Sequence, residues 1–147
     1  MRGERAESFV VLGLRLLALS FALVGVLFIA VPNGVLDTIS DLGDEIGGFS
    51  RAPHGTEQLW LALGFSYMVV ITGICLIAQS DVVRYRPLLL LLAVGKVASS
   101  LTSLGFYLFD DDVFAYLLNF LVDGSLALVA LWLWSLVGRI DRRPGAG

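Results

Sequence analysis

Apolar residues fall into four long runs along the chain, at about 9–31, 59–79, 87–109 and 113–137. Each run is at least as long as the roughly 20 residues that an α-helix needs to cross a hydrocarbon core of about 30 Å. The pattern therefore predicts an all-α fold, in which a bundle of four transmembrane helices forms a single integral membrane domain over residues 1–147. The first run is too long and too weakly flanked for a cleaved signal peptide, so we interpret it as a retained helix.

The segment 32–58 is the one long connection between these runs. It begins with "VPNG", in which Pro32 and Gly34 are helix breakers. The following stretch, "VLDTISDLGDEIG", carries apolar residues at helical spacing with acidic residues between them. These apolar positions are Val35, Ile39, Leu42 and Ile46. The pattern predicts a short amphipathic helix in this loop, lying on the membrane surface or capping the bundle.

Basic residues gather on one side of the predicted spans. Seven arginines lie in the N-terminal tail, the link between the second and third runs, and the C-terminal tail: Arg2, Arg5, Arg84, Arg86, Arg139, Arg142 and Arg143. The loop 32–58 carries only Arg51. Because cytoplasmic flanks are enriched in Lys and Arg, both termini are predicted to be cytoplasmic and the long loop extracytoplasmic. We expect a multi-pass protein of a bacterial-type inner (plasma) membrane.

Composition agrees with this interpretation and limits the chemistry. The chain is 57% hydrophobic and only 16% charged, more apolar than a small soluble domain can bury. Its single cysteine, Cys75, excludes an intramolecular disulfide, and its single histidine, His54, excludes a bis-histidine haem within one chain. We therefore predict no metal site and no bound cofactor. The absence of a basic patch argues against nucleic-acid binding.

Ionisable residues inside the apolar runs are the most informative feature. Each costs roughly 2.5–3.5 kcal/mol at the centre of a membrane helix, so each calls for an explanation. Arg15 lies close enough to the predicted cytoplasmic surface to extend its side chain to the headgroups. Lys96, near the middle of the third run, cannot easily do so. Asp123 and Asn119 lie within the fourth run.

Polar residues form matching stripes on the third and fourth predicted helices. The third helix carries Lys96, Ser99, Ser100 and Ser103 on one face, and the fourth carries Tyr116, Asn119 and Asp123. The short connection "DDD" folds these helices into a hairpin that places Asp123 opposite Ser99 and Asn119 opposite Ser103. We expect the stripes to meet inside the bundle, and Ser66 and Gly73 of the second helix are candidates for lining the same interior.

The sequence does not decide whether Lys96 and Asp123 form a direct ion pair. In the folded hairpin, Lys96 lies about three residues, on the order of 4.5 Å, deeper than Asp123. A lysine stem can cross that distance. However, side chains lean toward the N-terminus of their own helix, so these two side chains lean apart in an antiparallel pair.

Three roles remain open for the polar interior. It can act as a clasp that fixes the register of the helices, since polar side chains commonly join membrane helices. It can recognise a partner helix or an amphipathic ligand such as a lipid or quinone, through Lys96, Asp123, Asn119, the three serines and Tyr116. It can also conduct protons or ions in an oligomer, with Lys96 and Asp123 as titratable groups.

The segments "RLLALSFALVGVLFI" and "LGFSYMVVITGICLIA" resemble the pattern of DoxX-like small bacterial membrane proteins, through Arg15, Gly25, Gly64 and Gly73. The resemblance covers about half of the chain. It implies four helices and a small accessory subunit of a membrane redox or quinone-linked system, and it transfers no catalytic residue. Lys96 and the acidic outer loop do not match that family's pattern.

We therefore expect a non-catalytic accessory or scaffolding subunit of a membrane complex, which holds a partner helix or an amphipathic ligand against its polar interior. Its expected partners are the lipid bilayer and either other membrane subunits or further copies of the chain. The alternative is a small proton- or ion-coupled transporter or channel that acts as an oligomer.

Overall fold

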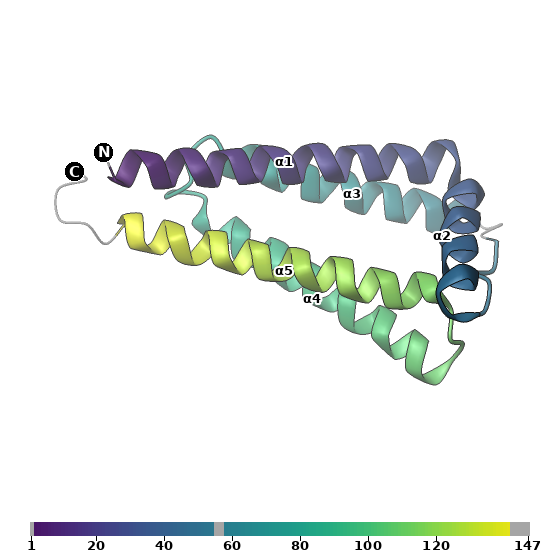
Figure 1. Cartoon of the computed structure of the whole chain (residues 1–147). Helices are drawn as coiled ribbons and strands as arrows, with labels where there is room; N and C mark the ends of the chain where they lie inside the picture. Colours follow the sequence, from purple (N-terminus) through teal and green to yellow (C-terminus); the bar gives the residue numbers. More distant parts are fainter. Residues whose placement is uncertain (1, 55–57, 142–147) are drawn as a thin grey trace.

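The computed structural model describes residues 2–54 and 58–141, and over these residues the chain is almost entirely helical. Five helices follow one another: α1 (Arg2–Ala30), α2 (Pro32–Gly47), α3 (Gln58–Ala78), α4 (Arg86–Phe109) and α5 (Phe114–Asp141). Figure 1 shows α1, α3, α4 and α5 running roughly side by side, with α2 lying across one end of the bundle.

Four of these helices, α1, α3, α4 and α5, are long and apolar enough to cross a membrane. The predicted all-α architecture with four apolar spans is thus confirmed. The helix ends differ from the predicted ones mainly at α1, which begins at Arg2 rather than near residue 9, and at α5, which continues to Asp141. Residues such as Glu4 and Arg5 are good helix formers, so the helix continues beyond its apolar part. Hydropathy predicts the length of the apolar segment, but it does not predict the residues at which the helix begins and ends.

The four long helices form two closely packed pairs, α1 with α3 and α4 with α5. The pairs lie close together at the end where α1 begins and α5 ends, which we call the terminus end, and they diverge toward α2, at the cap end (Figure 1). The residues that are almost completely buried concentrate toward the terminus end: Val10, Leu14, Leu89, Leu92, Leu133 and Val137. The apolar core therefore holds one half of the bundle together more tightly than the other.

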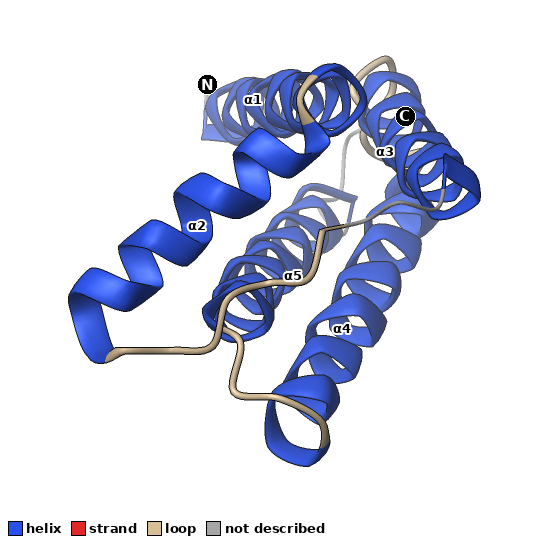
Figure 2. Cartoon of the chain, turned by 90° about the vertical axis from the view of Figure 1, so that its right-hand side faces the viewer, coloured by secondary structure: helices blue, strands red, loops and turns tan. Residues whose placement is uncertain are grey.

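At the cap end, α2 packs against the first turn of α5 through small residues (Figure 2). Ser40 and Gly43 are its buried residues, whereas Leu42 and Ile46 are exposed. A Cβ atom at Gly43 would lie 2.6 Å from Cβ of Phe114, closer than non-bonded carbons can approach. Glycine at this position thus sets the distance between α2 and α5.

Residues 48–54 return along α2 and tie it to the α4–α5 connection. Gly48 ends α2 with φ of 68°, a left-handed conformation that glycine adopts without strain. The Ser50 hydroxyl donates a hydrogen bond of 2.6 Å to Asp112, and the Phe49 ring lies 5.2 Å from that of Phe114. We call α2 together with residues 48–54 the cap.

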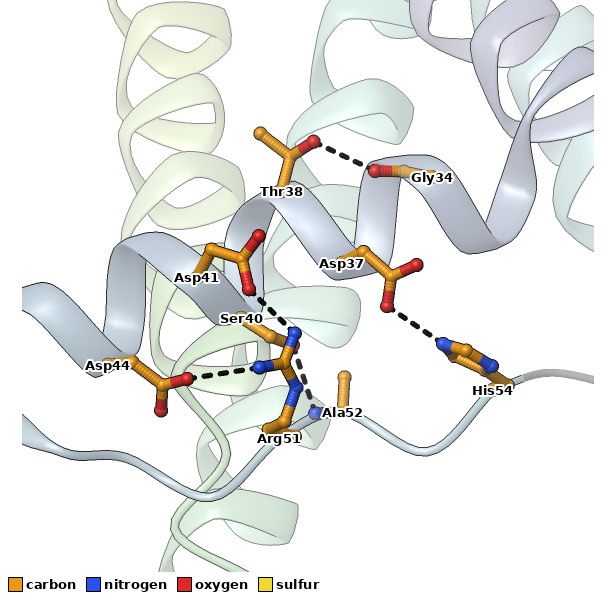
Figure 3. Close-up of polar contacts among 9 residues, drawn as sticks. All are labelled: Gly34, Asp37, Thr38, Ser40, Asp41, Asp44, Arg51, Ala52 and His54. Carbon is orange, nitrogen blue, oxygen red and sulfur yellow. Dashed lines mark hydrogen bonds and ion pairs between the residues drawn. The ribbon is translucent and has the colours of Figure 1, made fainter.

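Polar contacts within the cap hold its returning segment against α2 (Figure 3). The Arg51 guanidinium contacts Asp41 at 2.6 Å and Asp44 at 3.2 Å, and His54 Nε2 lies 2.8 Å from Asp37. The hydrogen bond to Asp41 raises the pKa of Arg51, so this cation remains charged. These ion pairs are exposed, and water and salt screen them. The close packing of Gly43 therefore matters more to the position of the cap.

Substitution of Gly43 tests this packing. Gly43→Ala places a methyl group against Phe114 Cβ, which cannot move without its backbone, so α2 has to shift away from α5 at a cost of about 1–3 kcal/mol. Hydrogen exchange of the α2 amides should become faster. The matched control is Gly34→Ala, where the nearest side-chain atom is 3.8 Å away and alanine favours the helix. Equal exchange in the two variants would contradict this account of the cap.

Candidate functional site

One side chain from each of the four long helices meets at the centre of the bundle. Lys96 of α4 donates a hydrogen bond of 2.8 Å from Nζ to Oδ1 of Asp123 on α5. The same ammonium group lies 4.8 Å from the centre of the Phe21 ring on α1 and 5.4 Å from that of Tyr67 on α3. Lys96 is 1% exposed and Asp123 is 5% exposed. We call these four residues the Lys96 cluster.

The cluster provides the buried ammonium group with a counter-charge and with two aromatic faces. An unpaired charge at this depth would lose its hydration without compensation, whereas a paired one regains much of that free energy through Coulomb attraction. The ring faces of Phe21 and Tyr67 carry partial negative charge and attract the same cation. The question left open by the sequence is therefore answered, because Lys96 and Asp123 pair directly despite the opposite lean of their side chains. The long lysine stem spans the offset between them.

Next to this cluster, hydrogen bonds join α4 and α5 along their polar stripes. The Asn119 amide donates to the Ser103 hydroxyl at 2.7 Å and to the Ser99 hydroxyl at 3.4 Å. The Ser100 hydroxyl donates to the backbone carbonyl of Phe120 at 2.8 Å. The predicted register, with Asn119 opposite Ser103, is confirmed. Ser99, Ser103 and Asn119 form what we call the amide ladder.

Two residues of the predicted interior lie elsewhere. Tyr116 packs its ring against Phe106, 5.7 Å between centroids, at the cap end of the hairpin. The expectation that Ser66 lines the interior is wrong, because this residue is exposed and its hydroxyl donates to the Ala62 carbonyl of its own helix. The next residue, Tyr67, occupies the inward position instead. Successive residues of an α-helix point about 100° apart, so Ser66 and Tyr67 face different sides of α3.

Sequence reasoning missed the aromatic members of the cluster, Phe21 and Tyr67. Aromatic residues are common throughout the apolar runs, so nothing in the sequence distinguishes these two from residues that face lipid. Arg15, in contrast, is exposed as expected, and its Nε donates a hydrogen bond to the Gln79 side chain at the end of α3.

A cavity of about 270 Å³ lies beside the Lys96 cluster, where the two helix pairs diverge. One part of its lining is apolar and is formed by Phe28, Trp60, Leu61, Gly64, Phe65 and Met68. The other part is polar and is formed by Tyr67, Ser99, Asn119 and Asp123. The Lys96 cluster and the amide ladder thus both reach this cavity, which we call the interhelical cavity.

The Tyr67 hydroxyl is buried and has no hydrogen-bond partner among the described residues. It lies against the backbone of α4, since a Cβ atom added at Gly95 would be 3.3 Å from it. Leaving a buried hydroxyl without a partner costs about 1–3 kcal/mol. Tyr67 lines the interhelical cavity, while its hydroxyl lies buried against α4.

Within the described residues, no group of three His, Cys, Asp or Glu side chains is arranged to hold a metal ion. Comparison of the chain with protein-family models, with curated proteins and with solved structures finds no match. The fold and the site therefore classify the protein by its structure only. It is an all-α bundle with four helices that could span a membrane and with a buried ion pair at its centre.

Breaking the ion pair should destabilise the bundle strongly. Lys96→Met leaves the Asp123 carboxylate buried without its counter-charge, which should lower the free energy of unfolding by about 3–5 kcal/mol. Replacing both partners, Lys96→Met with Asp123→Leu, should recover most of this loss because no charge remains buried. Reversible unfolding in mixed micelles measures both values.

The Asn119→Ala substitution serves as a comparison, since it removes a neutral hydrogen bond that is worth only about 1 kcal/mol between membrane helices. A double variant that is no more stable than Lys96→Met alone would show that the loss does not come from an unpaired Asp123 carboxylate.

Proposed function

We propose that this protein is a non-catalytic accessory subunit of a membrane complex and that it holds an amphipathic ligand, a lipid or a quinone, in the interhelical cavity. The observation that carries the proposal is the division of the cavity lining into an apolar part and a polar part. A ligand with a polar head and an apolar body matches that division, because each of its parts then meets groups of its own kind.

The size of the cavity favours an amphipathic ligand over a partner helix. A volume of about 270 Å³ is close to the lower end of typical small-molecule pockets. A helix with its side chains is about 10–12 Å across and needs considerably more room. A partner subunit would instead contact the outer faces of the four long helices, where residues such as Leu19 and Leu128 are exposed.

The polar head of the ligand has defined groups to contact. The Asp123 carboxylate accepts hydrogen bonds, the Asn119 amide and the Ser99 hydroxyl can each donate and accept, and the Tyr67 side chain lines the same cavity. Lys96 is already paired and almost completely buried, so its role is to fix Asp123 in place rather than to contact the ligand. In this proposal Lys96 acts as the clasp and Asp123, Asn119, Ser99 and Tyr67 contact the ligand.

The proposed setting is an inner (plasma) membrane, with both termini in the cytoplasm. Supporting this orientation, Arg2, Arg5, Arg84, Arg86 and Arg139 belong to the terminus end, whereas Arg142 and Arg143 lie outside the described residues. The cap then lies on the extracytoplasmic side, with α2 as an amphipathic helix at the membrane surface. The exposure of Leu42 and Ile46 supports contact between α2 and lipid.

The DoxX-like resemblance fits this proposal, since it implies an accessory subunit of a quinone-linked membrane system. The transport alternative depends on a different property of the same residues, namely proton exchange at the Lys96–Asp123 pair. It predicts pH-dependent uptake into proteoliposomes, which Asp123→Asn would abolish. Such uptake would contradict the purely ligand-holding role proposed here.

Ligand binding can be tested with a photoreactive short-chain quinone and a photoreactive phospholipid in nanodiscs. We expect at least one of these probes to crosslink to the first half of α3 and to the region around Asn119 and Asp123. Gly64→Leu should reduce the crosslinking several-fold. Gly64 lines the cavity and has no atom near the position of its added Cβ, so leucine can fill the space without a clash.

The matched control is Gly105→Leu on α4, where an added Cβ also meets open space but which does not line the interhelical cavity. This variant should crosslink like the wild type. If Gly64→Leu leaves the crosslinking of both probes unchanged, the cavity does not bind either class of ligand.

Membrane orientation can be tested with cysteines introduced one at a time. Cys75 is completely buried, so the wild type should not react with a membrane-impermeant maleimide. In intact cells, Pro53→Cys in the cap should be labelled, because residue 53 is exposed on the proposed outer side. Ser80→Cys in the α3–α4 connection should react only after permeabilisation. The reverse labelling pattern would contradict the proposed orientation.

A further inference from the structure

A second, smaller cavity lies at the terminus end, between the start of α4 and the last turns of α5. It has a volume of about 230 Å³ and is lined by Arg86, Trp134, Ser135, Gly138 and Arg139. Two arginines thus line one cavity at this end of the long helices. It shares none of its lining residues with the interhelical cavity.

Arg86 is held in a defined orientation at this site. Its guanidinium lies 4.2 Å from the centre of the Trp134 ring, and its Nε donates a hydrogen bond of 3.1 Å to the Trp134 carbonyl. A Cβ atom at Gly138 would lie 2.5 Å from its Nη2, so this glycine provides the space in which the guanidinium rests. The stacking and the hydrogen bond fix the plane of the guanidinium and leave its Nη groups available to an acceptor.

No carboxylate neutralises this pair of arginines within the described residues. No acidic side chain that the structure describes lies within ion-pair distance of Arg86 or Arg139, and the ion-pair contacts of Arg51, His54 and Lys96 lie elsewhere in the chain. An oriented guanidinium suits phosphate, since its N–H groups match the spacing of phosphate oxygens, and a second arginine lining the same cavity adds positive charge.

We propose that this cavity, which we call the arginine cavity, binds the phosphate headgroup of an anionic phospholipid. The proposal requires that the chain spans a membrane, but it is independent of any ligand in the interhelical cavity. Exposed apolar side chains lie about one helical turn from lining residues: Leu90 from Arg86 on α4, and Leu131 and Trp132 from Ser135 on α5. They provide a surface for acyl chains, which free phosphate lacks. Basic pockets between spans commonly bind anionic headgroups in this way.

Lipid retention by the full-length protein tests this site. The protein is reconstituted in nanodiscs of phosphatidylglycerol and phosphatidylcholine in equal amounts, and the lipids that remain bound after transfer to detergent are identified by native mass spectrometry. We expect selective retention of phosphatidylglycerol by the wild type. Arg139→Gln, at an exposed position, should reduce the retention at least about fivefold, the effect of one basic group near an anionic lipid.

Gly138→Ala separates the geometry of the site from its charge. The added methyl displaces the Arg86 guanidinium from the Trp134 ring, yet the net charge does not change. Alanine is the better helix former, so the helix itself should be preserved, which circular dichroism can verify. We expect this variant to lose selectivity for phosphatidylglycerol to a similar degree as Arg139→Gln.

The charge-matched control is Arg84→Gln, which removes one exposed arginine from the same end of the bundle but outside the cavity. It should retain phosphatidylglycerol within about twofold of the wild type, since salt screens exposed charges outside the site. Retention by Gly138→Ala at the wild-type level, or an equal loss in Arg84→Gln, would show that the binding is unspecific attraction and would overturn the proposal. Displacement of the lipid by millimolar inorganic phosphate would assign the cavity to a soluble anion and would overturn it as well.

Discussion

An ammonium group buried among apolar helices has to find its counter-charge and its polarisable surroundings within the protein, because burial removes it from water. In this bundle, Lys96 obtains them from all of the other long helices: a carboxylate from α5 and aromatic rings from α1 and α3. Each of these contacts restricts the rotation of one helix about its axis. Apolar packing between leucines and valines tolerates many rotations, whereas a buried charge tolerates very few. The Lys96 cluster therefore specifies which faces of the four helices meet.

The same constraint explains why the interior beside Lys96 is not filled with leucine. Asp123 has to lie where the lysine stem can reach it, and this position brings polar residues of α4 and α5 into contact along the amide ladder. The α1–α3 pair contributes mainly apolar and aromatic side chains, and it diverges from α4 and α5 toward the cap end (Figure 1). The interhelical cavity lies in the space between these two surfaces. The apolar part of its lining comes from α1 and α3, and its polar part comes from α4 and α5 together with Tyr67 of α3.

The sequence was sufficient to predict features that depend on a single helix or on one short turn. The four apolar runs follow from hydropathy, and the pairing of Asn119 with Ser103 follows from the fixed rise of a helix and the short turn between α4 and α5. Features that depend on how separate helices rotate against one another were not predictable. Ser66 and Tyr67 differ by one step along α3, and only the packing of α3 against the other helices decides that Tyr67 faces inward. The contact between Arg86 and Trp134 is of the same kind, because the two residues lie far apart in the sequence.

The two ends of the bundle differ in a way that follows from how each is held together. At the terminus end, large apolar residues fill the core and arginines surround it, so a phosphate headgroup can bind there only at the periphery, in the arginine cavity. At the cap end, the helix pairs are joined through α2 and its returning segment, whose ion pairs are exposed and screened. Opening the interhelical cavity from the cap end would thus disturb few buried contacts. Opening it from the terminus end would disrupt the apolar core and, deeper in the bundle, the Lys96 cluster. A ligand of the interhelical cavity is therefore expected to enter beside the cap, where the cost of separating the helix pairs is lowest.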